Sequence, residues 1–132
     1  CFALACDFVI GQRGTYRVGL NEASIGVPLP PFLLELGRLK LHSPFHMRAF
    51  VHGEVFTVDD AQHVGYIDEF VDSAEDLSSA AKSRAEMLAV LPNDSYLATK
   101  QFLRKSLFEM THPQIAQYVG PAFQKMKPPS AK

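Results

Sequence analysis

Apolar runs that are too short for helices, separated by glycine-containing turns, constrain the fold of this chain most. The runs at residues 8–10 and 16–20 flank the segment Gly11-Gln12-Arg13-Gly14, and this pattern predicts short strands in a sheet. Segments with apolar residues at helical spacing follow, at 32–39 and again beyond residue 73. The order predicts an α/β protein, with a core region over residues 1–72 and a helical region over residues 73–132.

Several helix boundaries can be predicted from capping residues. Serine, threonine, asparagine and aspartate favour helix starts, whereas glycine favours helix ends and proline excludes the helix interior. The predicted boundaries are a helix from Ser43-Pro44 to Val51, a helix from Thr57 to Gly65, a strand from Tyr66 to Val71, a helix from Ser73 to Pro92, a helix capped by Asn93 or Asp94 with a stripe reaching Met110, and a last helix from Pro113 to Met126.

Composition indicates a globular chain whose net charge is too small to attract anionic partners. The 132 residues are 47% hydrophobic and 20% charged, and the formal net charge is -1, so nucleic acid binding is not expected. No apolar run approaches the ~20 residues that span a bilayer. Cys1 and Cys6 suggest neither a disulfide framework nor a zinc site. His42 and His46 have the spacing of helical metal ligands, but Ser43-Pro44 starts a helix between them, so we expect no metal site.

One carboxylate has unusual sequence surroundings. Glu22 follows an apolar stretch and precedes Gly26 and the segment Pro28-Leu29-Pro30-Pro31. A carboxylate among apolar groups is suited to proton transfer, so Glu22 is the candidate general acid and base. A surface or helix-capping acid is the alternative interpretation.

These segments carry a family resemblance. Cys6-Asp7 before a strand, then Gly19-Leu20-Asn21-Glu22 and Gly26-Val27-Pro28, resemble the crotonase (enoyl-CoA hydratase/isomerase) superfamily, and most of all its enoyl-CoA delta isomerases. The stretch from His52-Gly53 to Asp68 and the position of Lys100 also fit. The resemblance covers almost the whole chain and implies the C-terminal portion of a crotonase-like fold, so we expect these residues to be part of a longer chain.

The resemblance implies an isomerase that moves the double bond of a fatty enoyl-CoA from the β-γ to the α-β position, with Glu22 as the single proton shuttle. Hydratases of the family use two glutamates, and the first aligns with Cys1, which favours isomerisation over hydration. No cofactor is expected beyond the coenzyme A of the substrate. The implied substrate contacts are Cys1, Ile25, Pro28, Leu29 and Phe32, and the implied coenzyme A contacts are Lys100, Arg104 and Lys125, for which a solvated helix face is the alternative.

The resemblance also implies a homo-oligomer, with a trimer favoured. It implies the mitochondrial matrix or the peroxisome in a eukaryote and the cytoplasm in a bacterium. Two alternatives stay open. One is another crotonase reaction, namely dienoyl-CoA isomerisation, hydration or thioester hydrolysis, and the other is a non-catalytic assembly module without the oxyanion hole, which the family places upstream of Cys1.

Overall fold

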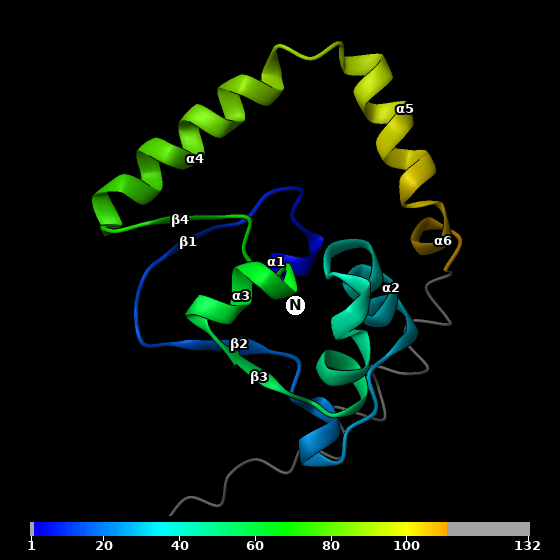
Figure 1. The fold of residues 1–132 in the computed structure, drawn as a ribbon. Coiled ribbons are helices and arrows are strands. Elements are labelled where there is room, and N and C mark those ends of the chain that lie inside the picture. Colours follow the sequence, from blue (N-terminus) through cyan, green and yellow to red (C-terminus); the bar gives the residue numbers. More distant parts are fainter. Residues whose placement is uncertain (1, 111–132) are drawn as a thin grey trace, which may run out of the picture.

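The short apolar runs form two separate two-stranded sheets in the structure, a computed structural model that describes residues 2–110. Strand β1 (Ile10–Gln12) pairs in parallel with β4 (Glu69–Val71), and β2 (Arg17–Gly19) pairs antiparallel with β3 (Val55–Thr57). The strands predicted on either side of the first turn therefore exist, with shifted bounds, but they lie in different sheets (Figure 1). Each is completed by a partner far away in the sequence.

Helices connect and cover these sheets. The predicted single helix from Ser43 to Val51 is wrong, because Pro44 lies in a 3-10 turn and the next turn is π-helical, with the His52 amide donating to the Met47 carbonyl at 3.0 Å. The helical elements are α1 (Phe2–Ala5), η1 (Glu22–Ile25), α2 (Pro31–Lys40), η2 (Ser43–Phe45), η3 (Met47–Val51), α3 (Val58–Val64), α4 (Ala74–Ala89), α5 (Asn93–Leu103) and α6 (Lys105–Phe108).

Two capping predictions are confirmed. Thr57 Oγ1 accepts a hydrogen bond from the Asp60 amide at 3.3 Å, and Ser73 Oγ accepts one from the Asp76 amide at 3.2 Å. Gly65 ends α3 in the left-handed conformation, with φ of 102°, which costs an L side chain energy but not glycine. These hydrogen bonds join residues three positions apart, so they stabilise the starts of α3 and α4 locally.

Other boundaries differ from the prediction. The strand predicted from Tyr66 forms only from Glu69, and Tyr66 itself is buried in the connection that precedes it. Helix α5 already includes Asn93, so Pro92 takes the cap position, and the helix ends before Arg104 instead of continuing to Met110. The helix predicted for residues 113–126 lies outside the described residues.

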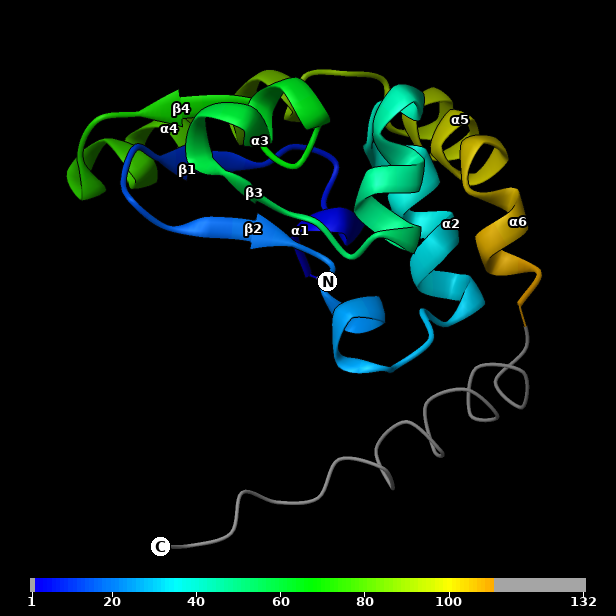
Figure 2. The same ribbon diagram turned by 60° about the horizontal axis from the view of Figure 1, so that its bottom comes forward.

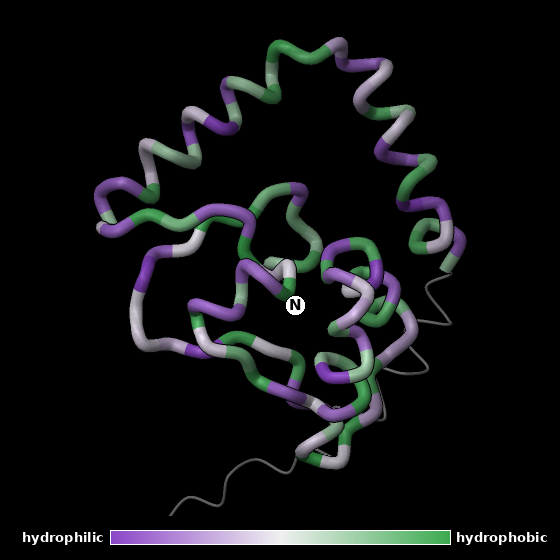
Figure 3. The backbone as a smooth tube through the Cα atoms, viewed as in Figure 1, coloured by the Kyte–Doolittle hydropathy of each residue, from purple (hydrophilic) through white to green (hydrophobic). Residues whose placement is uncertain are grey.

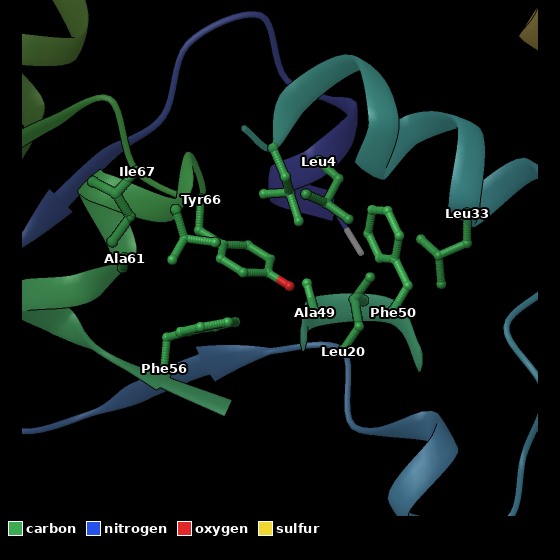
Figure 4. Close-up of a cluster of buried hydrophobic side chains, with 11 residues drawn as sticks. Leu4, Leu20, Leu33, Ala49, Phe50, Phe56, Ala61, Tyr66 and Ile67 are labelled. Carbon is green, nitrogen blue, oxygen red and sulfur yellow. The ribbon is translucent and has the colours of Figure 1, made fainter. Parts of the chain in front are cut away.

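The hydrophobic core lies between α1, α2, α3, η3 and the β2–β3 sheet (Figure 4). The rings of Phe56 and Tyr66 pack with centroids 6.0 Å apart. A methyl group on Gly37 would lie 2.5 Å from Phe50 Cε1, so α2 and η3 are in close contact. The buried hydrophobic residues are Leu4, Leu20, Leu33, Leu41, Ala49, Phe50, Phe56, Val58, Ala61, Val64, Tyr66 and Ile67.

Helices α4 and α5 form an arch that stands away from this core (Figure 1). None of their residues is buried, and the segment that joins them is hydrophobic (Figure 3). Arg84 anchors α4 through a 2.9 Å hydrogen bond to Glu69 and stacks 3.9 Å above the ring of Phe8. Val90 and Phe102 are 82% and 78% exposed. The division into regions at residues 72 and 73 stays a prediction.

Within residues 2–110, no helix combines the length and the apolar character that crossing a membrane requires.

Candidate functional site

Glu22 stands on a short 3-10 turn that directly follows the antiparallel pair. Strand β2 ends at Gly19, Leu20 enters the core, and η1 begins at Glu22 (Figure 2). The turn is closed by local hydrogen bonds, from Ser24 Oγ to the Asn21 carbonyl at 2.7 Å and from the Val27 amide to the Glu22 carbonyl at 2.9 Å. The backbone at Glu22 is thus held by hydrogen bonds of its sequence neighbours.

Two glycines shape the surroundings of η1. Gly26 ends the turn with φ of 76°, and a methyl group there would meet nothing within 4 Å. Gly53 has φ of 61°, and a methyl group there would lie 3.0 Å from the Ser24 amide nitrogen. The backbone before β3 therefore packs directly against the turn that carries Glu22.

The Glu22 carboxylate is shielded on one side and has no hydrogen-bond partner in the described part of the chain. Its Oε2 atom is buried and forms no hydrogen bond with any described residue. Other partly buried acids are engaged: Glu69 accepts from Arg84 at 2.9 Å, and Glu54 accepts from Arg48 Nε at 2.7 Å. Since a buried carboxylate oxygen without a donor is costly, this atom is suited to a proton or a hydrogen bond from outside the described residues.

A second orphan oxygen belongs to Tyr66. The residue is 2% exposed, and its hydroxyl has no hydrogen-bond partner among the described residues. Burial raises the pKa of Tyr66 to about 12; the nearby backbone of Leu20 opposes the shift and the charge of Glu22 adds to it. Tyr66 therefore stays a neutral phenol inside the core. Sequence reasoning missed it, although a tyrosine in a buried apolar run could have signalled a hydroxyl in need of a partner.

The predicted substrate contacts do not form one surface. Ile25 is 57% exposed, and Pro28 is also exposed. Leu29 and Phe32 are half-buried and pack against the hydrophobic core. Cys1 lies outside the described residues. The assignment of these five residues to substrate binding stays a prediction.

A cavity of about 500 Å³ lies between α1, the end of α2 and α5. Its apolar wall includes Leu4, Leu39 and Leu91, and Glu22 is not part of its lining. Its polar wall consists of Asp7, Lys40, Ser95, Tyr96, Thr99, Lys100 and Arg104.

Asp7 contacts three polar side chains at this wall, which lie on α5 or directly after it. Tyr96 Oη donates to Asp7 Oδ2 at 2.8 Å, Arg104 Nη2 donates to Oδ1 at 2.8 Å, and Lys100 forms a further ion pair. Burial raises the pKa of Asp7, but the hydrogen bonds from Lys100 and Tyr96 and the positive charges nearby outweigh it, so the net pKa is lowered. Lys100 and Arg104 are thus bound to Asp7, which differs from a solvated helix face, while coenzyme A binding by them stays a prediction. Lys125 lies outside the described residues.

His42, His46 and Asp60 form hydrogen bonds within the fold. His42 Nδ1 lies 2.8 Å from the His63 carbonyl oxygen, and His46 Nε2 lies 3.0 Å from the Leu41 carbonyl oxygen. Asp60 accepts a 2.7 Å hydrogen bond from the Thr57 hydroxyl at the start of α3. Within residues 2–110, no three histidine, cysteine or acidic side chains are grouped so as to hold a metal ion.

Known proteins are similar to this chain in sequence and in fold. The family model described as enoyl-CoA hydratase/isomerase matches residues 1–126. "Enoyl-CoA delta isomerase 1, mitochondrial" of Mus musculus is 30% identical over 105 residues, which are 79% of this chain and 36% of that protein. The human protein of the same name is 29% identical over 79% of this chain and 34% of its own length. The chain therefore spans about a third of the length of these curated relatives.

Solved structures agree on the fold. The crystal structure of human mitochondrial delta3-delta2-enoyl-CoA isomerase superposes with a TM-score of 0.78 at 25% identity, over 90% of this chain and 48% of that chain. An enoyl-CoA hydratase/isomerase family protein from Pseudomonas syringae superposes with a TM-score of 0.75 at 28% identity, over 96% of this chain and 53% of that chain. The expected α/β crotonase-like fold is confirmed, and the chain belongs to the enoyl-CoA hydratase/isomerase family.

Proposed function

We propose that the protein isomerises unsaturated fatty enoyl-CoA, moving the double bond from the β-γ to the α-β position with Glu22 as the proton shuttle. The observation that carries this proposal is the buried Oε2 of Glu22, which has no hydrogen-bond partner within residues 2–110 and stands on a turn held by its neighbours. The names of the curated relatives, which are enoyl-CoA delta isomerases, support the same reaction.

The chemistry needs one base that becomes an acid. The carboxylate takes a proton from the α carbon of the acyl thioester, the electrons move to give a dienolate, and the same group returns the proton to the γ carbon. A carboxylate that forms no ion pair with the described residues can take up and return the proton, whereas an ion-paired one such as that of Glu54 would first have to leave Arg48. Proton transfer of this kind needs no cofactor beyond the coenzyme A of the substrate.

The test is Glu22→Gln in the full-length protein that carries this sequence, with Glu86→Gln on the exposed side of α4 as the matched control. Glutamine keeps the size of the side chain but cannot accept the proton, so isomerase turnover should fall by ~10² or more while the KM for the enoyl-CoA changes little. The control should keep wild-type turnover. A Glu22→Gln enzyme that isomerises at the wild-type rate would overturn the proposal.

The same enzyme can be assayed for hydration of a trans-2-enoyl-CoA. Hydration in this family takes two glutamates, and the first aligns with Cys1, so isomerase turnover should greatly exceed hydratase turnover. Comparable rates of the two reactions would favour a second carboxylate elsewhere and a different crotonase reaction. Cys1→Ala should change isomerisation only modestly.

We also propose binding of the coenzyme A phosphates by Lys100, Arg104 and Lys125. Lys100 and Arg104 both form ion pairs with the single carboxylate of Asp7 at the cavity wall, so the cluster has a net charge of +1. Lys100→Ala should then raise the KM for the enoyl-CoA without lowering turnover. For a eukaryotic protein we propose the mitochondrial matrix, since the curated relatives are named as mitochondrial proteins.

The alternative of an assembly module has one observation in its favour. Helices α4 and α5 expose large apolar side chains, among them Val90, Leu97 and Phe102, as expected of a surface that another subunit covers. We propose that the protein is a homo-oligomer, with a trimer favoured. A full-length protein that assembles but shows no isomerase, hydratase or thioesterase activity would support the module.

A further inference from the structure

We propose that the cavity between α1, the end of α2 and α5 binds a medium-chain alkyl carboxylate, with the chain on the apolar wall and the head group at Lys100 and Arg104. Glu22 is not among the residues that line this cavity. The inference therefore goes beyond the proposed isomerase function and does not depend on it.

The size and the apolar wall of the cavity suit an alkyl chain. Its volume of about 500 Å³ lies within the range of roughly 300–1,000 Å³ that is usual for sites of small organic ligands. Leu4 and Leu39 form the wall on the side of the core, and Leu91 and Leu103 form it before α5 and at its end. Leu91 and Leu103 are 45% and 66% exposed, so an alkyl chain would displace water from apolar surface.

One face of α5 and its C-cap residue borders the cavity. The residues of this face recur three and four positions apart, as neighbours on a helix surface do; they are Ser95, Tyr96, Thr99, Lys100, Leu103 and Arg104. Leu97 and Phe102, which α5 also exposes, do not line the cavity. The cavity face therefore differs from the face proposed for contacts between subunits, and both can be occupied in one protein.

The charges at the wall favour a ligand with one negative charge. Lys100 and Arg104 share the single carboxylate of Asp7, and Lys40, the other charged residue of the lining, pairs with Asp68. One positive charge is thus left beside apolar surface, and a carboxylate would neutralise it. The side chains of Lys100 and Arg104 are 32% and 18% exposed, so both cations can be reached from the cavity.

Attachment of α5 to α1 does not explain both cations. Arg104 Nη2 donates to Asp7 Oδ1 at 2.8 Å and to the Ala5 carbonyl at 3.2 Å. Tyr96 Oη donates to Asp7 Oδ2 at 2.8 Å. These contacts join the two elements and neutralise Asp7 without Lys100. The second cation therefore adds a charge that the attachment does not need.

The experiment is calorimetric titration of the full-length protein with decanoate. Coenzyme A is left out, because its phosphates are proposed to reach the same cations. Decanoate should bind saturably. Acetate, which lacks the chain, should bind at least about a hundredfold more weakly, since each buried methylene contributes roughly fourfold in affinity. Decyltrimethylammonium, which has the chain but a positive head group, should bind at least about tenfold more weakly.

Two variants locate the site. Lys100→Met removes the extra charge but leaves the bonds between Arg104 and Asp7, so the protein should fold and bind decanoate about tenfold more weakly or worse. Thr99→Phe adds a ring on the cavity face and should weaken binding by at least a similar factor. Lys82→Met, on the exposed side of α4, is the matched control for lost charge and should stay within about twofold of the wild type.

Three results would overturn the inference. They are the absence of saturable decanoate binding, equal affinity for decyltrimethylammonium, and equal losses in Lys82→Met and Lys100→Met. Isomerase activity does not enter the titration, so failure here leaves the proposed function of Glu22 to its own test.

Discussion

Replacing Gly53 by alanine should destabilise the protein through the turn that carries Glu22. The residue has φ of 61°, and the new methyl group would lie 3.0 Å from the Ser24 amide nitrogen. A left-handed conformation costs an alanine about 1–2 kcal/mol. The close contact adds an overpacking term of about 1–3 kcal/mol, because the neighbour is backbone and cannot rotate away.

Gly26→Ala separates these two contributions. Gly26 has φ of 76°, so alanine pays the same conformational cost there, but a methyl group would meet nothing within 4 Å. We expect Gly26→Ala to lower the free energy of unfolding by about 1–2 kcal/mol and Gly53→Ala to lower it by about 2–5 kcal/mol, the sum of both terms.

Urea unfolding of the two full-length variants beside the wild type measures the difference. Isomerase kinetics provide the functional readout, because Gly53→Ala should displace η1 and lower kcat more than its effect on folding accounts for. Equal stability of the two variants would refute the contact between Gly53 and η1. Unchanged kcat in a folded Gly53→Ala protein would refute its link to Glu22.

Two further predictions concern α4 and α5. Asp7→Asn should loosen α5 and lower the free energy of unfolding near pH 7 by about 1–2 kcal/mol. Because the pKa of Asp7 in the folded protein lies below its ordinary value of 3.8, this stabilisation is present above that value and is lost as the pH falls through the folded pKa. The unfolding curves of variant and wild type should therefore converge below about pH 4, and a difference that persists at pH 2 would contradict the ion cluster. The 132-residue chain should self-associate, with a trimer favoured, or prove unstable, because α4 and α5 and the segment between them expose large apolar side chains. Light scattering should show weaker association in a Val90→Ser, Phe102→Ser variant, and a stable monomer would refute this prediction.

The local features were predictable because neighbouring residues create them. The Thr57 and Ser73 hydroxyls cap helices through amides three residues later, and Gly65 ends α3 through its own backbone conformation. Glu22 could be singled out for a similar reason, since its apolar neighbours and the glycine-proline segment adjoin it in the sequence. The family resemblance rested on the same contiguous segments and is confirmed.

Features that depend on distant segments were not predictable in the same way. The partner of β1 is β4, and an apolar run of three residues does not specify which strand it joins. The helix predicted after Ser43 became a 3-10 turn and a π-helical turn where η3 packs closely on Gly37. Lys100 and Arg104 share a helical face in the sequence, but only the fold brings Asp7 to that face.

The same distinction between local and long-range features applies to the candidate site. The sequence alone singled out Glu22 as the candidate acid, because a carboxylate at the end of an apolar run is a local property. Only the tertiary structure decided that Gly53 packs against its turn and that Oε2 is buried without a partner among the described residues. Burial and hydrogen bonding are properties of atoms brought together from separate segments, and no spacing within one segment encodes them.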